Sequence, residues 1–180
     1  MTVELDDLLT PRVRLRRWRP EDAAPMAAIN SDPEVTRYLN RPADPRAVAE
    51  FHGRVLDHWE RYGFGWFALE SREPALAGRL LGFAGVAHPS FLPEVATRPE
   101  LGWRLGREAW GRGLATEAAV TARDHAFGVL MVPELIAIIQ PDNERSRRVA
   151  TKLGMTVERP IDNPTLGRAV ELWQMPRPRP

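Results

Sequence analysis

Two short stretches of the chain hold residue types that suit ligand binding. The first is WGRGLATEA at 110–118, where a glycine-rich turn precedes a helix expected to begin at about Gly113. Free backbone N–H groups at a helix start attract phosphate oxygens, and glycine lets a ligand approach the main chain closely. Gly111, Arg112 and Gly113 therefore predict a pyrophosphate site, although the two glycines could simply form a turn.

The second stretch is PDNERSRRVATKLGM at 141–155, which has the periodicity of an amphipathic helix. Asn143 and Ser146 fall at the N-terminal end of its buried stripe, where polar groups need partners. In one interpretation Asn143 caps the helix and the Ser146 hydroxyl bonds back to its own helix. In the other, a bound ligand is the partner of both side chains.

Alternating strands and helices must position these two stretches. The patterning predicts strand, two helices, three strands, then helix, strand, helix and two strands, with no repeat and no linker. Residues 1–180 are therefore expected to form a single mixed α/β domain. The expected strands are 12–18, 64–70, 80–87, 99–105, 134–140, 155–159 and 169–175, and the expected helices begin at about 20 and cover 45–62, 113–129 and 142–154.

Composition excludes several classes of protein. With 43% hydrophobic residues the chain is not disordered, and no apolar run approaches the roughly 20 residues of a membrane helix. A net charge of +1 gives no general attraction to nucleic acid. The chain has no cysteine, and its four histidines lack metal-ligand spacing with carboxylates, so we expect neither a thiolate nucleophile nor a metal. The acidic start MTVELDDLL is unlike a signal peptide, which predicts a cytoplasmic protein.

Basic residues are concentrated near the N-terminus, in RVRLRRW at 12–18. Val13 and Leu15 alternate there with arginines, as on a half-buried strand. We therefore expect the alternate face, with Arg16 and Trp18, to be a solvated strand face and not an RNA site.

Together, in this order and about 30 residues apart, the two stretches resemble the GNAT acyltransferase superfamily, specifically its RimJ/RimL-like branch. The family pattern [QR]xxGx[GA] matches at Gly113 and Ala115, with Trp110 in place of the usual Gln or Arg. The family's PDN...S..V..KLG signature matches from Pro141 to Gly154. RLRRWRPEDA at 14–23, SDPEV at 31–35 and HWERYGFGWFAL at 58–69 extend the resemblance over nearly the whole chain.

The resemblance implies the GNAT fold, with a mostly antiparallel sheet of six to seven strands flanked by about four helices. It also implies acetyl-CoA as the donor, with Asn143 contacting it and direct transfer to an amine, which agrees with the absence of cysteine. The acyl-pantetheine arm would pair with the strand at Trp103, Arg104 and Leu105. The pyrophosphate would lie on the backbone amides of Gly111, Arg112, Gly113, Leu114, Ala115 and Thr116.

Two residues are candidates for proton transfer in such a reaction. Glu100 lies in the strand before the loop, where several GNAT members carry a base glutamate. The alternative is an exposed strand glutamate paired with an arginine such as Arg104. Ser146 could protonate the leaving thiolate, and water could do the same.

Acceptor recognition is less readable in the sequence. Tyr38 and Trp66 fall in regions that wall the acceptor site in relatives, although core packing would also explain Trp66. We expect an N-acetyltransferase that acts on a primary amine, with a protein or peptide N-terminus as the leading acceptor. The alternatives are a small-molecule amine acetyltransferase and a domain that binds acyl-CoA without turnover. A homodimer is implied by the resemblance only.

Overall fold

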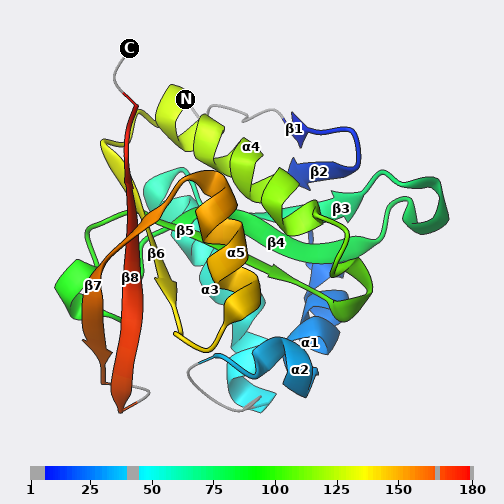
Figure 1. The fold of residues 1–180 in the computed structure, drawn as a ribbon. Helices are drawn as coiled ribbons and strands as arrows, with labels where there is room; N and C mark the ends of the chain where they lie inside the picture. The colour runs from blue at the N-terminus through cyan, green and yellow to red at the C-terminus, as the bar shows by residue number, and fades with distance from the viewer. Residues whose placement is uncertain (1–6, 40–44, 165–166, 179–180) are drawn as a thin grey trace.

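A computed structural model describes residues 7–39, 45–164 and 167–178 as one mixed sheet with helices on both faces (Figure 1). The sheet has eight strands in the order β1-β2-β3-β4-β5-β6-β8-β7. Every neighbouring pair is antiparallel except β5 and β6. The strands are β1 (Leu8–Leu9), β2 (Val13–Arg16), β3 (Trp66–Ser71), β4 (Leu80–Ala87), β5 (Glu100–Leu105), β6 (Glu134–Ile139), β7 (Thr156–Asn163) and β8 (Arg168–Pro176).

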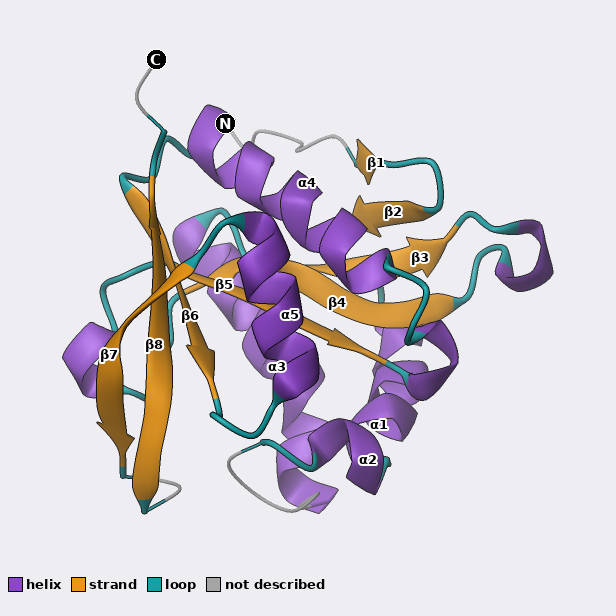
Figure 2. Ribbon diagram, in the orientation of Figure 1, coloured by secondary structure: helices purple, strands orange, loops and turns teal. Residues whose placement is uncertain are grey.

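Helices cover the two faces of the sheet unequally. The α-helices are α1 (Ala23–Ser31), α2 (Pro33–Thr36), α3 (Pro45–Tyr62), α4 (Leu114–Gly128) and α5 (Glu144–Leu153). Figure 2 shows α4 and α5 on one side of the strands, with α1 and α3 on the other. The alanines at 118, 119, 122 and 126 are all buried, so α4 packs closely on the sheet.

The fold class and the main elements predicted from the sequence are confirmed. The sheet has one strand more than the six to seven expected, because β1 is only two residues long and carries no alternation that could reveal it. Strand β7 continues to Asn163, beyond the predicted end at 159, because it pairs with β8 along its whole length. The helix expected from about residue 20 begins with a 3-10 turn, Pro20–Asp22, before α1.

The prediction of a solvated face on the first strand is wrong for Arg16 and Trp18. Arg16 is 4% exposed, and its guanidinium pairs with Asp22 at 2.7 Å and with Glu70 at 2.6 Å. Trp18 is also buried, and its Nε1 donates to the carbonyl of Trp66. The reason is that the turn Pro20–Asp22 and helix α3 lie against this face: Asp22 pairs with Arg16, and Phe51 packs against Trp18 with ring centroids 6.1 Å apart. The buried ion pairs give Arg16 a structural role.

Strands β5 and β6 separate almost as soon as they meet. Their parallel pairing is registered at a single position, Glu100 opposite Ile136, whereas β5 pairs with β4 from Glu100 to Leu105. Figure 2 shows the two strands running apart from this point, with α5 lying over the opening. The far side of residues 103–105 is therefore an edge without a partner strand among the described residues.

No helix in the described part of the chain is long and apolar enough to cross a membrane.

Candidate functional site

A single large cavity occupies the opening between β5 and β6. Its volume is about 1190 Å³, and both of the sequence stretches singled out above line it. We call the part lined by the loop before α4 and by α5 the donor half. We call the part lined by α2, α3, β3 and the end of β4 the acceptor half. Glu100 and residues 101–105 of β5 lie between the two halves.

The start of α4 presents free amide groups in the donor half. Gly111 and Gly113 have φ values of +73° and +78°, in the left-handed region. The two glycines therefore do form a turn, as the alternative interpretation of the sequence expected. Gly113 is the N-cap, and no side chain caps the helix. The first helical hydrogen bond runs from the Glu117 N–H to the Gly113 carbonyl, which leaves the amides of Leu114, Ala115 and Thr116 available. The turn and the predicted anion site are thus formed by the same residues.

Arg12 holds this loop in place, a role that sequence analysis missed. Its Nε donates to Glu117 of α4 at 2.7 Å, and its Nη1 donates to the carbonyl of Arg112 at 2.7 Å. On the other side, Trp110 Nε1 donates to the Leu105 carbonyl at 2.8 Å. Hydrogen bonds therefore hold the loop both to the residue just before β2 and to β5. Only the position of Arg12 at the head of a predicted strand could have hinted at this contact.

Arg112 is the one predicted donor-site residue that does not line the cavity. Its guanidinium forms a salt bridge with Glu73, on the far side of the loop. Three other basic residues line the donor half from α5, namely Arg145, Arg148 and Lys152, and the Arg145 guanidinium lies 4.1 Å from the centroid of the Trp110 ring. Positive charge at this end of the cavity therefore comes mainly from α5.

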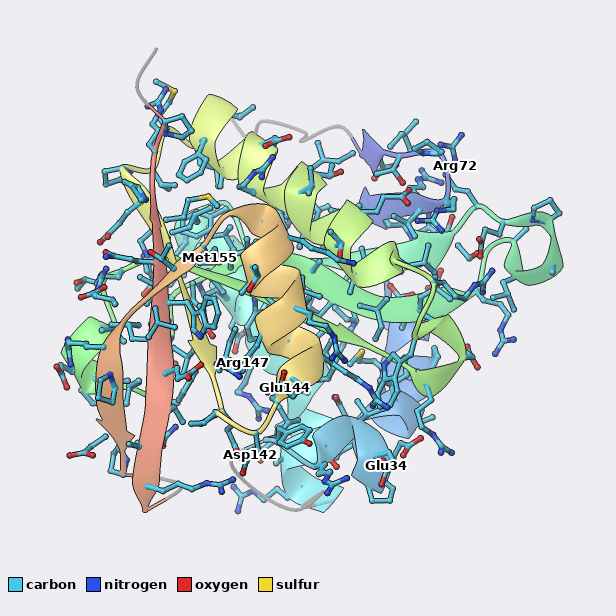
Figure 3. The ribbon with its side chains drawn as sticks, in the orientation of Figure 1. Glu34, Arg72, Asp142, Glu144, Arg147 and Met155 are labelled. Carbon is cyan, nitrogen blue, oxygen red and sulfur yellow. The ribbon has the colours of Figure 1, made fainter. Side chains whose placement is uncertain are left out.

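Both interpretations of Asn143 and Ser146 can be compared with the geometry of α5. Asn143 Oδ1 accepts a hydrogen bond from the Ser146 N–H at 3.2 Å, so the helix cap is confirmed. The Ser146 hydroxyl makes no hydrogen bond among the described residues, unlike Thr151, whose Oγ1 donates to the Arg147 carbonyl at 3.0 Å. Both Asn143 and Ser146 line the cavity. Figure 3 shows Asp142 and Glu144 at this same end of α5.

Glu100 is buried where β5 and β6 meet. It is 8% exposed and forms no ion pair with Arg104, so the alternative of an exposed, paired glutamate is wrong. Burial raises the pKa of its carboxyl group from 4.5 to about 7, against the opposing effect of the Arg104 charge. A carboxylate with a pKa near neutrality at the junction of the two halves is suited to accept a proton.

Trp66 lies against β5 at Gly102. Its indole stacks on Phe83 with ring centroids 4.5 Å apart, and a Cβ placed on Gly102 would lie 3.0 Å from its Nε1. The indole therefore covers Gly102 and both packs in the core and lines the cavity. Tyr38 also lines the acceptor half, where its carbonyl accepts a hydrogen bond from Gln140 Nε2 at 2.6 Å.

Two histidines of the acceptor half were missed by sequence analysis. His58 Nδ1 lies 2.9 Å from the Phe64 carbonyl, and His58 Nε2 accepts from the His88 N–H at 3.0 Å. Because both ring nitrogens are used in this way, His58 is held as one neutral tautomer. Burial lowers the pKa of both His58 and His88, and the Nδ1 of His88 is buried without a partner in the described part of the chain. Their spacing in the sequence resembles no motif.

Among the described residues, no group of three or more His, Asp or Glu side chains could hold a metal ion.

Known proteins resemble this chain over a range that includes the residues of the site. A family model described as "Acetyltransferase (GNAT) domain" matches residues 12–156. The chain belongs to the GNAT acetyltransferase family. It is 32% identical to YkkB of Bacillus subtilis over 156 residues, which cover 86% of this chain and 87% of that protein.

Solved GNAT structures share the fold. An acetyltransferase from Agrobacterium tumefaciens superposes with a TM-score of 0.81 at 26% identity, covering 97% of this chain and 96% of that one. Spermidine N-acetyltransferase from Vibrio cholerae, in complex with CoA and spermine, has a TM-score of 0.74 at 14% identity, with 93% and 97% covered. GNAT membership makes this chain an N-acetyltransferase.

Proposed function

We propose that this GNAT protein transfers an acetyl group from acetyl-CoA directly to an α-amino group, with a protein or peptide N-terminus as its acceptor, as the RimJ/RimL-like resemblance implies. The observation that carries the proposal is the position of Glu100. It lies at the junction of a donor half with free helix amides and an acceptor half lined by aromatic residues.

The donor half suits the parts of acetyl-CoA. The amides of Leu114, Ala115 and Thr116, which have no helical partner, would bind the pyrophosphate oxygens. The unpaired edge of β5 at 103–105 offers backbone groups to the amides of the pantetheine arm. Cationic side chains of α5 in the donor half favour a ligand rich in phosphate.

Proton transfer follows from the two candidate groups. Glu100 removes the proton from the acceptor ammonium, the amine nitrogen then forms a bond with the acetyl carbonyl carbon, and the bond from carbon to sulfur breaks. The departing thiolate takes a proton from the Ser146 hydroxyl or from water, and the second proton that the nitrogen loses as the amide forms replaces it there. The free hydroxyl of Ser146 in the cavity supports this assignment.

The pKa of Glu100 favours an α-amine over a lysine side chain. An α-ammonium group has a pKa of about 8 and lysine about 10.4. Transfer to a carboxylate with a pKa of about 7 is then uphill by about 1.4 kcal/mol for the α-amine. For lysine it is uphill by about 4.6 kcal/mol, which would slow the reaction more than a hundredfold.

Thiol release from acetyl-CoA tests the proposal. The acceptors are peptides with a free N-terminus, the same peptides with a blocked N-terminus and an internal lysine, and spermidine. We expect steady release with the free N-termini and little with the blocked peptides. Preference for spermidine would place the protein among small-molecule acetyltransferases. Binding of acetyl-CoA without release for any acceptor would make it a non-catalytic domain.

A further inference from the structure

One cation in the acceptor half is left with most of its hydrogen-bonding capacity unused. Arg104 lies on the face of β5 toward α1 and α3, where its Nη1 donates to Asn30 Oδ1 at 2.7 Å. Among the described residues this is its only hydrogen bond, although a guanidinium has five N–H donors. The guanidinium also lies over the rings of Phe83 and Phe51, at 5.2 Å and 5.6 Å from their centroids.

Arg104 is half-buried and has no ion pair among the described residues, unlike the buried Arg16. A guanidinium that is partly removed from water without a carboxylate partner is costly. Burial lowers the pKa of Arg104 to about 10, while the charge of Glu100 opposes this shift and that of Arg54 adds to it. Arg54 also lines the acceptor half, but it pairs with Glu50 at 3.5 Å. Arg104 is therefore the guanidinium of this half that has no carboxylate partner among the described residues, and an anion would balance its charge.

Glu100 and Arg104 share one face of β5 but do not pair. Residues two apart on a strand point to the same side, so Glu100, Gly102 and Arg104 form one row. The indole of Trp66 covers Gly102, the middle member of that row. The indole lies between the two charged residues along this row, and its Nε1, the atom nearest Gly102, is buried without a hydrogen-bond partner among the described residues. A negative group and a positive group are thus presented to the same cavity at two separated points.

From this arrangement we propose that the acceptor carries a carboxylate as well as its amine, with the amine at Glu100 and the carboxylate bound by Arg104 across the Trp66 indole. The inference rests on the proposed function and narrows its acceptor class. Arginine binds a carboxylate through two parallel N–H donors, and four of the N–H groups of Arg104 are available for this. Peptides with an acidic residue beside the N-terminus have this chemistry, whereas the amine and the carboxylate of a free amino acid are too close together to reach both side chains across the indole.

Matched acceptors test the proposal on the wild-type protein. One pair is alanyl-aspartyl amide and alanyl-asparaginyl amide, and a second pair is phenylalanine and phenylalanine amide. We expect kcat/KM to be about tenfold to a hundredfold higher for alanyl-aspartyl amide than for alanyl-asparaginyl amide. The second pair should show no such preference, because the two groups of phenylalanine are too close together to reach Glu100 and Arg104 at once. Equal rates within the first pair would overturn the proposal while leaving acetyl transfer intact.

Variants then assign the preference to the residue. Arg104→Gln should abolish the carboxylate preference, and Arg104→Lys should retain part of it. Arg61→Gln, which removes an exposed arginine from the end of α3, is the control and should change nothing. An unchanged preference in Arg104→Gln would overturn the proposal. If that variant does not fold, the wild-type comparison still decides.

Calorimetry separates failure of this inference from failure of the proposed function. The four acceptors are titrated into the protein saturated with CoA. Tighter binding of the carboxylate members without any thiol release would support the anion site and contradict the transfer reaction. If the carboxylate members neither bind nor cause release of thiol, both this inference and the proposed function are overturned.

Discussion

Replacing Glu100 by glutamine should stabilise the protein while it impairs the reaction. The carboxyl group is 8% exposed, and burial raises its pKa from 4.5 to about 7. A raised pKa means that the folded state binds the proton more tightly than the unfolded state. The wild-type protein therefore loses stability as the pH rises from about 4.5 to about 7, and the loss is complete above that range.

The magnitude follows from the size of this shift. Each pH unit between the two pKa values corresponds to about 1.4 kcal/mol, so the full loss is about 3 kcal/mol. Glutamine has nearly the same shape and does not ionise. Glu100→Gln should therefore exceed the wild type in unfolding free energy by about 3 kcal/mol more at pH 8.5 than at pH 4.5.

Urea unfolding at several pH values measures this difference. Glu60→Gln is the control, because Glu60 is an exposed glutamate on α3, and its unfolding free energy should follow that of the wild type at every pH. Parallel curves for Glu100→Gln and the wild type would refute the reasoning. They would mean that water reaches the carboxylate, and its assignment as a base with a pKa near neutrality would fail.

Three further predictions concern catalysis and donor binding. The kcat/KM of the wild type should rise with pH, with an apparent pKa near 7. Glu100→Gln should not show this rise, and its rate should be about 10²- to 10⁴-fold lower. A variant that keeps the rise would remove the assignment of Glu100 as the base. Ser146→Ala should lower kcat severalfold. The control Thr151→Ala, which removes a hydroxyl that donates to its own helix, should not lower it. Equal effects of the two variants would indicate water as the proton donor. Arg12→Gln should raise the KM for acetyl-CoA and leave kcat largely unchanged, because the loop before α4 loses its hydrogen bonds to Arg12. Arg14→Gln, on the same predicted strand, is the control. The same effect in that variant would show a general loss of stability instead.

Much of the fold was predictable because local signals and packing agree. Helix α5 has an asparagine cap at Asn143 and ends at Gly154, which has a φ of +86°, and both signals can be read from the sequence. The two glycines of the α4 loop likewise adopt the left-handed conformation. The loop and the helix cap of the donor half were therefore predictable. The salt bridge of Arg112 with Glu73 and the contacts of Arg12 were not, because each joins the loop to a segment distant in the sequence.

The acceptor half was less predictable because its residues meet only through the tertiary fold. Glu100 could be placed on a strand, but its burial depends on β6 pairing with β5 at that one position. Outside the cavity, Arg16 likewise has the sequence context of a surface residue, and only the fold brings Asp22 and Glu70 to it. His58 and His88 lie 30 residues apart and are joined by one hydrogen bond to a backbone amide. No periodicity in the sequence reports such contacts.

Calorimetric titration of acetyl-CoA tests the central claim most directly. The wild-type protein should bind it with one site per chain. Gly113→Glu should abolish binding, because it places a carboxylate among the amides that would hold the pyrophosphate. Gly113→Ala, which carries the same backbone strain at a φ of +78° without the charge, should weaken binding far less. No binding by the wild type, or unchanged affinity in Gly113→Glu, would contradict the account.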